Sequence, residues 1–315
     1  MRRICPVIVL LCLLCGCKGR QGSASPAPSY RPFPRAMVNA SGQDAVEHMM
    51  LHYWDSFTDT TVLYASDSLA INGVRNDDAE AALGAFATFV QQIPHEVALQ
   101  AMENFYSRID AFQRVFPHAN MFEKMVAFTS RYFYDPNSPV RDESLYLPFV
   151  SRLAGSDLVD PGLHMAYEWD ARMCSLNLPG TPAADFPFTD TAGRIRTLYS
   201  IKADYTLLIF GNPDCTACRE LMEVMESIPE ISALIESGRL KVVDIYIDGE
   251  VDLWKEHIPE SPATWLNGYD HTMTIRDNLV YDVRALPSLY LLDARKTVLR
   301  KDAPEDRILN DLVQI

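Results

Sequence analysis

Apolar side chains recur at intervals of three and four residues through the first half of the chain. The clearest case is 95–115, where they cover one broad face of the expected helix. The same spacing predicts further helices over 43–57, 76–93, 117–134, 143–153 and 162–173. Pro117 would stand in the first turn of its helix, where proline is tolerated. Because many of these faces are aromatic, we expect a packed helical core, with an aromatic ligand groove as the alternative.

The pattern changes after the segment 178–186, which is rich in proline and glycine and is expected to be a linker. Short apolar runs separated by turns then predict strands at 186–189, 195–199, 205–210, 240–247, 288–292 and 297–301. Helices are expected at 218–237, ending at Gly238, and at 252–257 and 305–313. Strands alternating with helices in this way predict an α/β domain with a mixed sheet flanked by helices, preceded by an all-α domain.

The N-terminus has the pattern of a secretory signal. Arg2 and Arg3 precede an apolar run at 4–14, which is too short to be a stable membrane span. The run ends in Leu-Cys-Gly-Cys17, which looks like a bacterial lipobox, with cleavage before Cys17 and lipid attached to it. The alternative is an ordinary signal peptide with chance cysteines. We therefore expect a lipoprotein at the periplasmic face of the inner or outer membrane.

These patterns predict four segments. They are a signal peptide over 1–16, a flexible tether rich in Gly, Ser and Pro over 17–35, a helical domain over 36–174 and an α/β domain over 175–315. A length of 315 residues suits two domains better than one. The formal net charge of −14 argues against a nucleic-acid partner and against docking on anionic lipid, and favours simple solubility.

The cysteines point to redox chemistry. Of seven, three leave with the signal and Cys17 would carry lipid, so Cys174, Cys215 and Cys218 remain as thiols. Cys215-Thr-Ala-Cys218 follows a buried strand and opens a helix, where unpaired N–H groups and the helix dipole favour a thiolate. Cys215 would therefore attack a disulfide and Cys218 would resolve the mixed disulfide, which is thiol–disulfide exchange.

A proline far along the chain completes this pattern. Pro287 stands directly before a buried strand, and with a CxxC upstream we expect a cis peptide bond that faces the cysteines. The backbone of Leu286 could then hydrogen-bond a substrate as an added strand. A plain trans proline at the start of a strand is the alternative.

Residues 186–315 resemble the thioredoxin superfamily, nearest in style to the membrane-tethered TlpA/ResA-like thiol–disulfide oxidoreductases. The entry segment 179–186, the Cys215–Cys218 pair and Leu286-Pro287 carry the resemblance. The helical part resembles a domain of unassigned function that precedes thioredoxin folds in some Gram-negative lipoproteins. The resemblance implies an exchange enzyme, on the reducing side by analogy.

Two positions depart from the family pattern. Asp214 replaces the tryptophan that often precedes the first cysteine, and its charge should oppose a low thiol pKa. The acid that assists proton transfer in thioredoxin is replaced by Ile209. Glu220, in the first turn after Cys218, is the nearest substitute as a proton relay; the alternative is a solvated helix carboxylate.

Other interpretations of the CxxC are weaker. Zinc would need more ligands than Cys174, His257 and His271 offer at these spacings, so no metal is expected. A structural disulfide fits the strand-to-helix context poorly. We expect Cys174 to be a free, half-buried linker thiol; a third exchange cysteine is the alternative.

We therefore expect an extracytoplasmic thiol–disulfide oxidoreductase that acts on disulfides of exported proteins. No haem or flavin motif is evident, so no cofactor is expected and electrons would come from a partner dithiol protein. The alternative is a lipid-anchored interaction protein whose thioredoxin fold is a scaffold with little turnover. A peroxiredoxin-type peroxidase fits less well, because the loop before Cys215 lacks the expected Pro/Thr-rich form.

Overall fold

A computed structural model describes residues 30–34 and 42–315. The predicted signal peptide, Cys17 and most of the predicted tether lie outside these residues. The part of that tether which is described packs on the helical part: Phe33 lies edge-on to Trp54, with ring centroids 5.7 Å apart. No helix within the described ranges is both long and apolar enough to cross a membrane.

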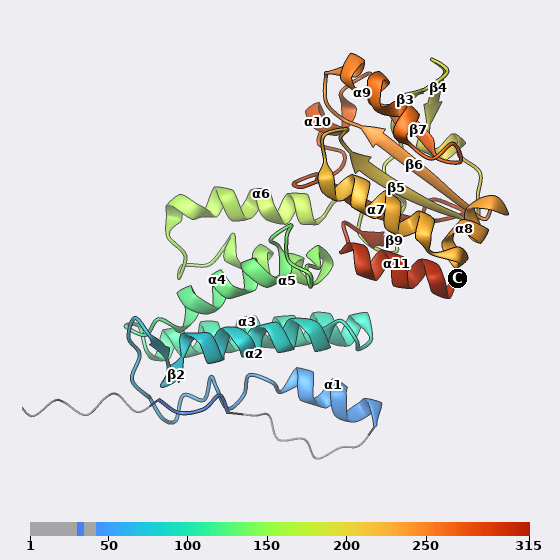
Figure 1. The fold of residues 1–315 in the computed structure, drawn as a ribbon. Helices are drawn as coiled ribbons and strands as arrows, with labels where there is room; N and C mark the ends of the chain where they lie inside the picture. The colour runs from blue at the N-terminus through green and yellow to red at the C-terminus, as the bar shows by residue number, and fades with distance from the viewer. Residues whose placement is uncertain (1–29, 35–41) are drawn as a thin grey trace, which may run out of the picture.

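The first part of the chain, which we call the helical region, runs from α1 to α6 (Figure 1). Its elements are α1 (Gln43–Leu51), β1 (Ala70–Ile71), β2 (Val74–Arg75), α2 (Asn76–Val90), α3 (His95–Val115), α4 (Met121–Phe133), α5 (Glu143–Leu153), the 3-10 turn η1 (Pro161–Leu163) and α6 (His164–Cys174). These helices share one core of aromatic and aliphatic side chains. The predicted packed helical core is confirmed.

The bounds of two helices differ most from prediction. The first helix ends at Leu51 rather than at residue 57, because the chain turns so that Trp54 packs on Phe105, with ring centroids 4.7 Å apart. Pro117 precedes α4 instead of lying in its first turn. The Gln113 side chain donates to the carbonyls of Pro117 and Ala119 and so holds this segment as a separate turn.

A short hairpin in the helical region was not predicted. Its turn, Asn72-Gly73, has positive φ at both residues, 45° and 77°. Asn-Gly is the dipeptide best suited to this type of two-residue hairpin turn, because both residues tolerate the left-handed conformation. The turn signal was present in the sequence, but the two strands have only two residues each.

The second part, which we call the sheet region, holds a seven-stranded mixed sheet in the order β4-β3-β7-β6-β5-β8-β9. The strands are β3 (Pro187–Asp190), β4 (Ile195–Thr197), β5 (Tyr205–Gly211), β6 (Leu240–Tyr246), β7 (Leu266–Tyr269), β8 (Ser288–Asp293) and β9 (Val298–Lys301). The central strand β5 is parallel to β6 and antiparallel to β8. The predicted mixed sheet is confirmed, and β7 is an addition to it.

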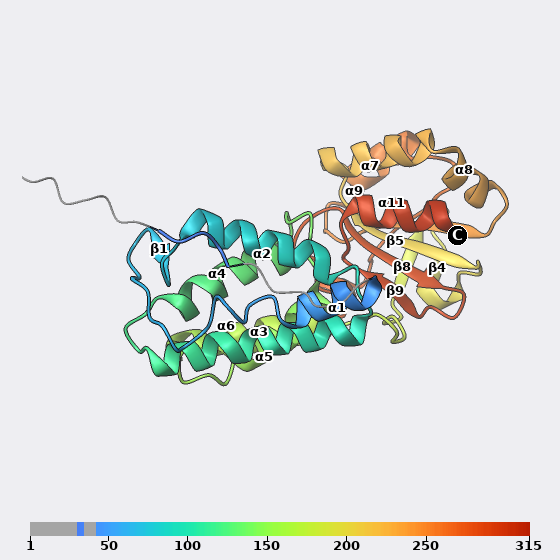
Figure 2. The ribbon, with the colours of Figure 1, turned by 90° about the horizontal axis from the view of Figure 1, so that it is seen from below.

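The long helices of the sheet region lie on one face of this sheet (Figure 2). These helices, α7 (Thr216–Ser227), α8 (Pro229–Glu236) and α11 (Glu305–Gln314), pack with β5, β6 and β8 in one apolar cluster. The opposite face holds an aromatic cluster around Phe186, Phe210 and Tyr281. The remaining elements are η2 (Leu198–Ser200), α9 (Val251–His257), η3 (Ile258–Glu260) and α10 (Thr274–Asp277).

The single helix predicted over 218–237 is wrong. It is two helices, α7 and α8, separated at Ile228. Ile228 has extended backbone angles, φ −96° and ψ 108°, because the ring of Pro229 disfavours a helical conformation in the residue before it. Pro229 itself begins α8, where its missing N–H costs nothing. Gly238 follows α8 with φ 75°, as a helix-ending glycine requires.

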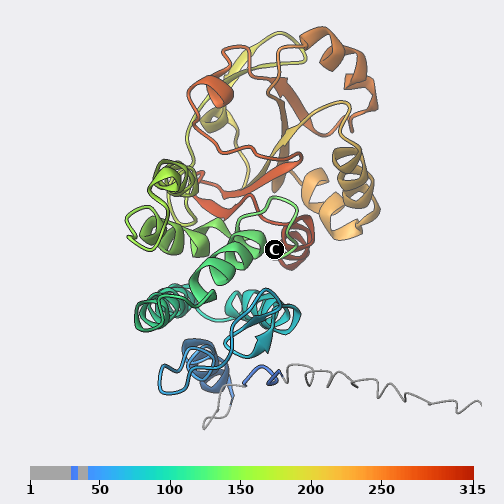
Figure 3. The same cartoon turned by 90° about the vertical axis from the view of Figure 1, so that its left-hand side faces the viewer.

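The two regions contact each other along one side of the sheet region (Figure 3). At the centre of the contact, Lys301 on β9 donates to the carbonyls of Met173 and Cys174 at the end of α6, at 2.9 and 2.8 Å. Its ammonium also lies 2.8 Å from the carboxylate of Glu143, and both side chains are almost fully buried. The cation thus satisfies the otherwise unpaired carbonyls at a helix C-terminus.

Candidate functional site

The predicted cysteine pair lies at the junction of β5 and α7. Strand β5 is buried along nearly its whole length, so it fixes the position of the loop that follows. Cys215 is the N-cap residue of α7, and its sulfur accepts a hydrogen bond from the Cys218 N–H at 3.1 Å. The two cysteines form a disulfide, with Cα atoms 5.2 Å apart. Cys215 therefore occupies the helix N-terminus that the sequence predicted.

Hydrogen bonds hold the loop before Cys215. The Asn212 carbonyl accepts from the Cys215 N–H at 3.0 Å, and its side-chain oxygen accepts from the Asp214 N–H at 3.0 Å. The Asn212 amide in turn donates to Asp248, at 2.9 Å. The carboxylate of Asp214 is exposed to solvent. The loop is therefore fixed without help from the Asp214 side chain.

The proline before β8 lies next to the cysteines. The Leu286–Pro287 peptide bond is cis, so this prediction is confirmed. Strand β8 pairs with β5 up to the position where Ser288 faces Phe210, which brings Pro287 beside the end of β5. Leu286, Pro287 and Ala217 line one groove together. Segments some 70 residues apart in sequence are thus joined at one edge of the sheet.

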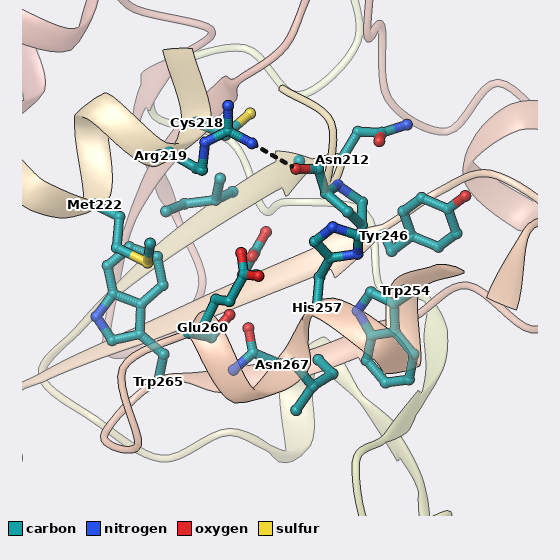
Figure 4. Close-up of a pocket in the computed structure, with 16 residues that line it drawn as sticks. Asn212, Cys218, Arg219, Met222, Tyr246, Trp254, His257, Glu260, Trp265 and Asn267 are labelled. Atoms are coloured by element: carbon teal, nitrogen blue, oxygen red, sulfur yellow. Dashed lines mark hydrogen bonds between the residues drawn. The ribbon is translucent and has the colours of Figure 1, made fainter. Parts of the chain in front are cut away.

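A pocket lies on the other side of Cys218 (Figure 4). Side chains from several elements line it, including Cys218 and Met222 of α7, Tyr246 of β6, His257 of α9 and Asn267 of β7. We call it the Cys218 pocket. The disulfide is therefore open to a second cavity in addition to the groove beside Pro287.

Asp244 of β6 also lines the Cys218 pocket. Desolvation by the surrounding protein raises the pKa of this carboxyl group to about 7. No cation or hydrogen-bond donor among the described residues offsets this effect. Asp244 faces Ile209 across the parallel β5–β6 pair, so it lies on the sheet face covered by α7. It can therefore gain or lose a proton near neutral pH, close to the cysteines.

Gly211 lies beside both this carboxylate and the sulfur of Cys218. A Cβ atom placed on Gly211 would lie 2.9 Å from Asp244 Oδ1 and 3.8 Å from Cys218 Sγ. Because both distances are measured from the same Cβ position, the separation between the oxygen and the sulfur is at most the sum of the two distances. That gap is short enough for ordered water to bridge.

The prediction from sequence missed Asp244. The family pattern predicts the acid on β5, where Ile209 stands, and the nearest substitute predicted from the sequence is Glu220 of α7. The structure places Glu220 on the exposed surface of α7, away from the Cys218 pocket. A signal was present in the run Val242-Val243-Asp244-Ile245, because a carboxylate inside a buried apolar strand is unusual.

The remaining candidates lie elsewhere. Cys174 is not half-buried, as expected, but fully buried in the core of the helical region. Burial raises the pKa of its thiol well above the ordinary value, with a smaller contribution from Glu143. His257 lines the Cys218 pocket, whereas His271 does not. The described part of the chain contains no cluster of three or more His, Cys, Asp or Glu side chains that could hold a metal.

Comparisons with known proteins agree with this fold. Residues 29–169 match a family described as a domain of unknown function, DUF5106. A crystal structure of a thioredoxin-like protein from Bacteroides caccae is 31% identical and covers 91% of this chain and 98% of its own, with a TM-score of 0.75. The C-terminal domain of an uncharacterized protein from Bacteroides fragilis is 43% identical over 43% of this chain and 97% of its own, with a TM-score of 0.42. No curated protein matches.

The chain belongs to the thioredoxin-like proteins, in the arrangement of the Bacteroides caccae relative, which it matches over almost its entire length. The predicted resemblance of residues 186–315 to the thioredoxin superfamily is thereby confirmed. The helical region corresponds to a domain to which no function is assigned.

Proposed function

We propose that this protein is a thiol–disulfide oxidoreductase that acts on disulfides of other exported proteins. One observation carries the proposal: the Cys215–Cys218 pair begins α7, beside Pro287 and above the carboxyl group of Asp244. The close relation to a thioredoxin-like protein supports it. In an interaction protein with an inert disulfide, Cys215 would not need to stand at the N-terminus of a helix, and Cys218 would not need a proton acceptor nearby.

In the first step, the thiolate of Cys215 attacks one sulfur of the substrate disulfide. A mixed disulfide forms between Cys215 and the substrate, and the other substrate sulfur leaves as a thiolate. The helix N-terminus favours the Cys215 thiolate, because its unpaired N–H groups stabilise negative charge. The Cys218 N–H, which points at the Cys215 sulfur, contributes one such group.

In the second step, Cys218 loses its proton and attacks Cys215. The Cys215–Cys218 disulfide forms, and the second substrate sulfur leaves as a thiolate, so the substrate gains two electrons. We propose Asp244, rather than Glu220, as the group that accepts the Cys218 proton through water. Its position beside Gly211 and its pKa of about 7 support this role. A partner dithiol would reduce the enzyme again.

We also propose that the protein is an envelope lipoprotein anchored through Cys17, with the domain boundary near residue 174. The Leu-Cys-Gly-Cys17 pattern after an apolar run supports the anchor. Incorporation of labelled palmitate into the wild type, but not into Cys17→Ser, would test it. A soluble wild-type protein without lipid would refute it.

A redox titration tests the exchange activity. The protein would be equilibrated with defined thiol–disulfide buffers, and the dithiol form would be measured by maleimide mass shift, with Cys215→Ser as the control. We expect a reversible two-electron couple between about −270 and −120 mV, the span of known exchange proteins. A pair that stays oxidised far below that span would refute the proposal and favour the interaction lipoprotein.

A further inference from the structure

A groove beside the cysteines is built by both regions of the chain. On one side, Pro136, Asn137 and Pro139 come from the loop between α4 and α5 of the helical region. On the other side stand Ala217, from between the two cysteines, and the segment ending at Pro287. The first residues of α11 close one end. We call this the interface groove.

Arg284 fixes the wall that contains Pro287. Its guanidinium stacks on the ring of Tyr134, 3.8 Å from the centroid, and donates to the Tyr134 carbonyl and to the carboxylate of Glu143. It also lies 3.1 Å from the carboxylate of Asp282. Since this side chain is mostly buried and paired on several sides, the segment around Leu286 is held against the helical region.

A second set of contacts fixes the end of the groove. Arg141, which also lines the groove, donates to the carbonyls of Asp302 and Ala303 at 2.8 and 3.2 Å. Arg307 of α11 pairs with Asp142 at 3.2 Å. The helical region is therefore tied to both segments of the sheet region that border the groove.

The groove offers unpaired backbone groups to a ligand. Ala285 and Leu286 precede β8, and neither makes a backbone hydrogen bond with another residue of the described chain. Such groups pair with an extended polypeptide, which adds as a short strand. The small and apolar side chains of Ala217, Leu286 and Pro287 leave room for that strand beside the disulfide.

We infer that the helical region forms the second wall of a groove that binds an extended, cysteine-bearing segment of the substrate polypeptide. This inference rests on the proposed exchange activity and assigns a role to the domain of unknown function. The enzyme then prefers a disulfide presented on a flexible segment. A small disulfide reaches Cys215 without using the groove wall.

Asn137→Trp tests the wall. Asn137 is exposed, and among the described residues its side chain hydrogen-bonds only to Asp135 of its own turn, so the fold should tolerate the change. Asn310→Trp on α11 is the matched control, since Asn310 is exposed and lies outside the groove. Full-length reduced protein would react with two substrates. One is a flexible peptide of about ten residues whose single cysteine is in mixed disulfide with thionitrobenzoate, and the other is dithiobis(nitrobenzoate).

We expect Asn137→Trp to slow the reaction with the peptide at least about 10-fold and to change the reaction with the small disulfide by less than about 2-fold, because the bulky ring fills the groove. Asn310→Trp should resemble the wild type with both substrates. If Asn137→Trp reacted with the peptide as fast as the wild type does, the groove proposal would be refuted and the proposed exchange activity would stand. A wild type inert toward both substrates would overturn the proposed function and the groove with it.

A trapping experiment gives an independent result. Cys218→Ser should hold the peptide in a mixed disulfide with Cys215, and a benzophenone two residues from the peptide cysteine would then be photoactivated. Cross-links to residues 136–141 are expected. Cross-links confined to the Cys218 pocket would show that the substrate lies on the opposite side and would refute the inference.

Discussion

The carboxyl group of Asp244 and the sulfur of Cys218 both lie beside Gly211, within 2.9 and 3.8 Å of the point where a Cβ would stand, and Gly211 has no side chain to fill that space. The two residues come from β6 and α7, and 25 other residues stand between them in sequence. The register of β5 against β6 places Asp244 below the start of α7. A carboxyl group that titrates near neutral pH thus lies close to the resolving cysteine.

Replacing Asp244 should slow the second exchange step. In Asp244→Asn, release of the second substrate thiol should fall about 10- to 100-fold at pH 8, because a positioned base is lost. In the wild type this step should accelerate as pH rises through about 7, where Asp244 loses its proton. Below about pH 6 the two proteins should converge. Single-turnover stopped-flow kinetics from pH 5.5 to 8.5 would measure this, with Glu220→Gln as the control; a loss in Glu220→Gln but not in Asp244→Asn would reverse the assignment.

The same variant should alter the pH dependence of stability. The folded-state pKa of Asp244 is raised from 3.8 to about 7, so the folded protein binds more protons than the unfolded chain between these pH values. Stability of the wild type should therefore fall as pH rises from 4 to 7. Asp244→Asn lacks this loss and should be more stable at pH 8 by about 1–4 kcal/mol, the upper value being the full shift at 1.36 kcal/mol per unit. Urea unfolding of the oxidised proteins at pH 4 and pH 8 would measure it; equal pH slopes would contradict the burial of the charge.

Gly211 should tolerate no side chain. The added Cβ of Gly211→Ala would lie 2.9 Å from Asp244 Oδ1 and 3.8 Å from Cys218 Sγ. We expect a loss of the second exchange step comparable to that in Asp244→Asn, because water can no longer connect the two groups. Gly155→Ala is the matched control, since an added Cβ there meets no atom within 4 Å. Equal kinetics in both variants would show that no proton path runs beside Gly211.

Cys174 should be inert in the native reduced protein. It is fully buried, and burial raises the pKa of its thiol, so little thiolate forms and reagents cannot reach it. Alkylation with iodoacetamide followed by peptide mass analysis should modify Cys215 and leave Cys174 unmodified until denaturant is added. Rapid native labelling of Cys174 would instead support a third exchange cysteine.

The buried charges between the two regions should matter for stability. Glu143→Ala removes the carboxylate that pairs with both Lys301 and Arg284, so two buried cations lose this partner. We expect the free energy of unfolding to fall by about 3–5 kcal/mol. Asp157→Asn breaks a salt bridge with Arg114 that is exposed to solvent, and should cost less than about 1 kcal/mol. Denaturant unfolding measures both, and similar costs would mean that the buried cluster contributes no more than a surface pair.

Local patterns predicted the elements well where periodicity and turn residues agreed. The helices 95–115 and 143–153 have the predicted bounds, because an apolar face and proline or aspartate before it define each start. The predicted end of the first helix is wrong because the packing of Trp54 against other helices outweighed the helical spacing of the apolar residues around it. The prediction of one helix over 218–237 is wrong because Pro229 disfavours a helical conformation in Ile228, the residue before it.

The sequence by itself determined the strand-to-helix position of Cys215 and Cys218, since neighbouring residues form that motif. It also indicated Pro287 through its place before an apolar run. Only the tertiary structure placed Asp244 below Cys218, because strand order and register, which depend on contacts distant in sequence, decide which side chains meet across a sheet. For the same reason, only the fold brought the helical region to the side of the cysteines.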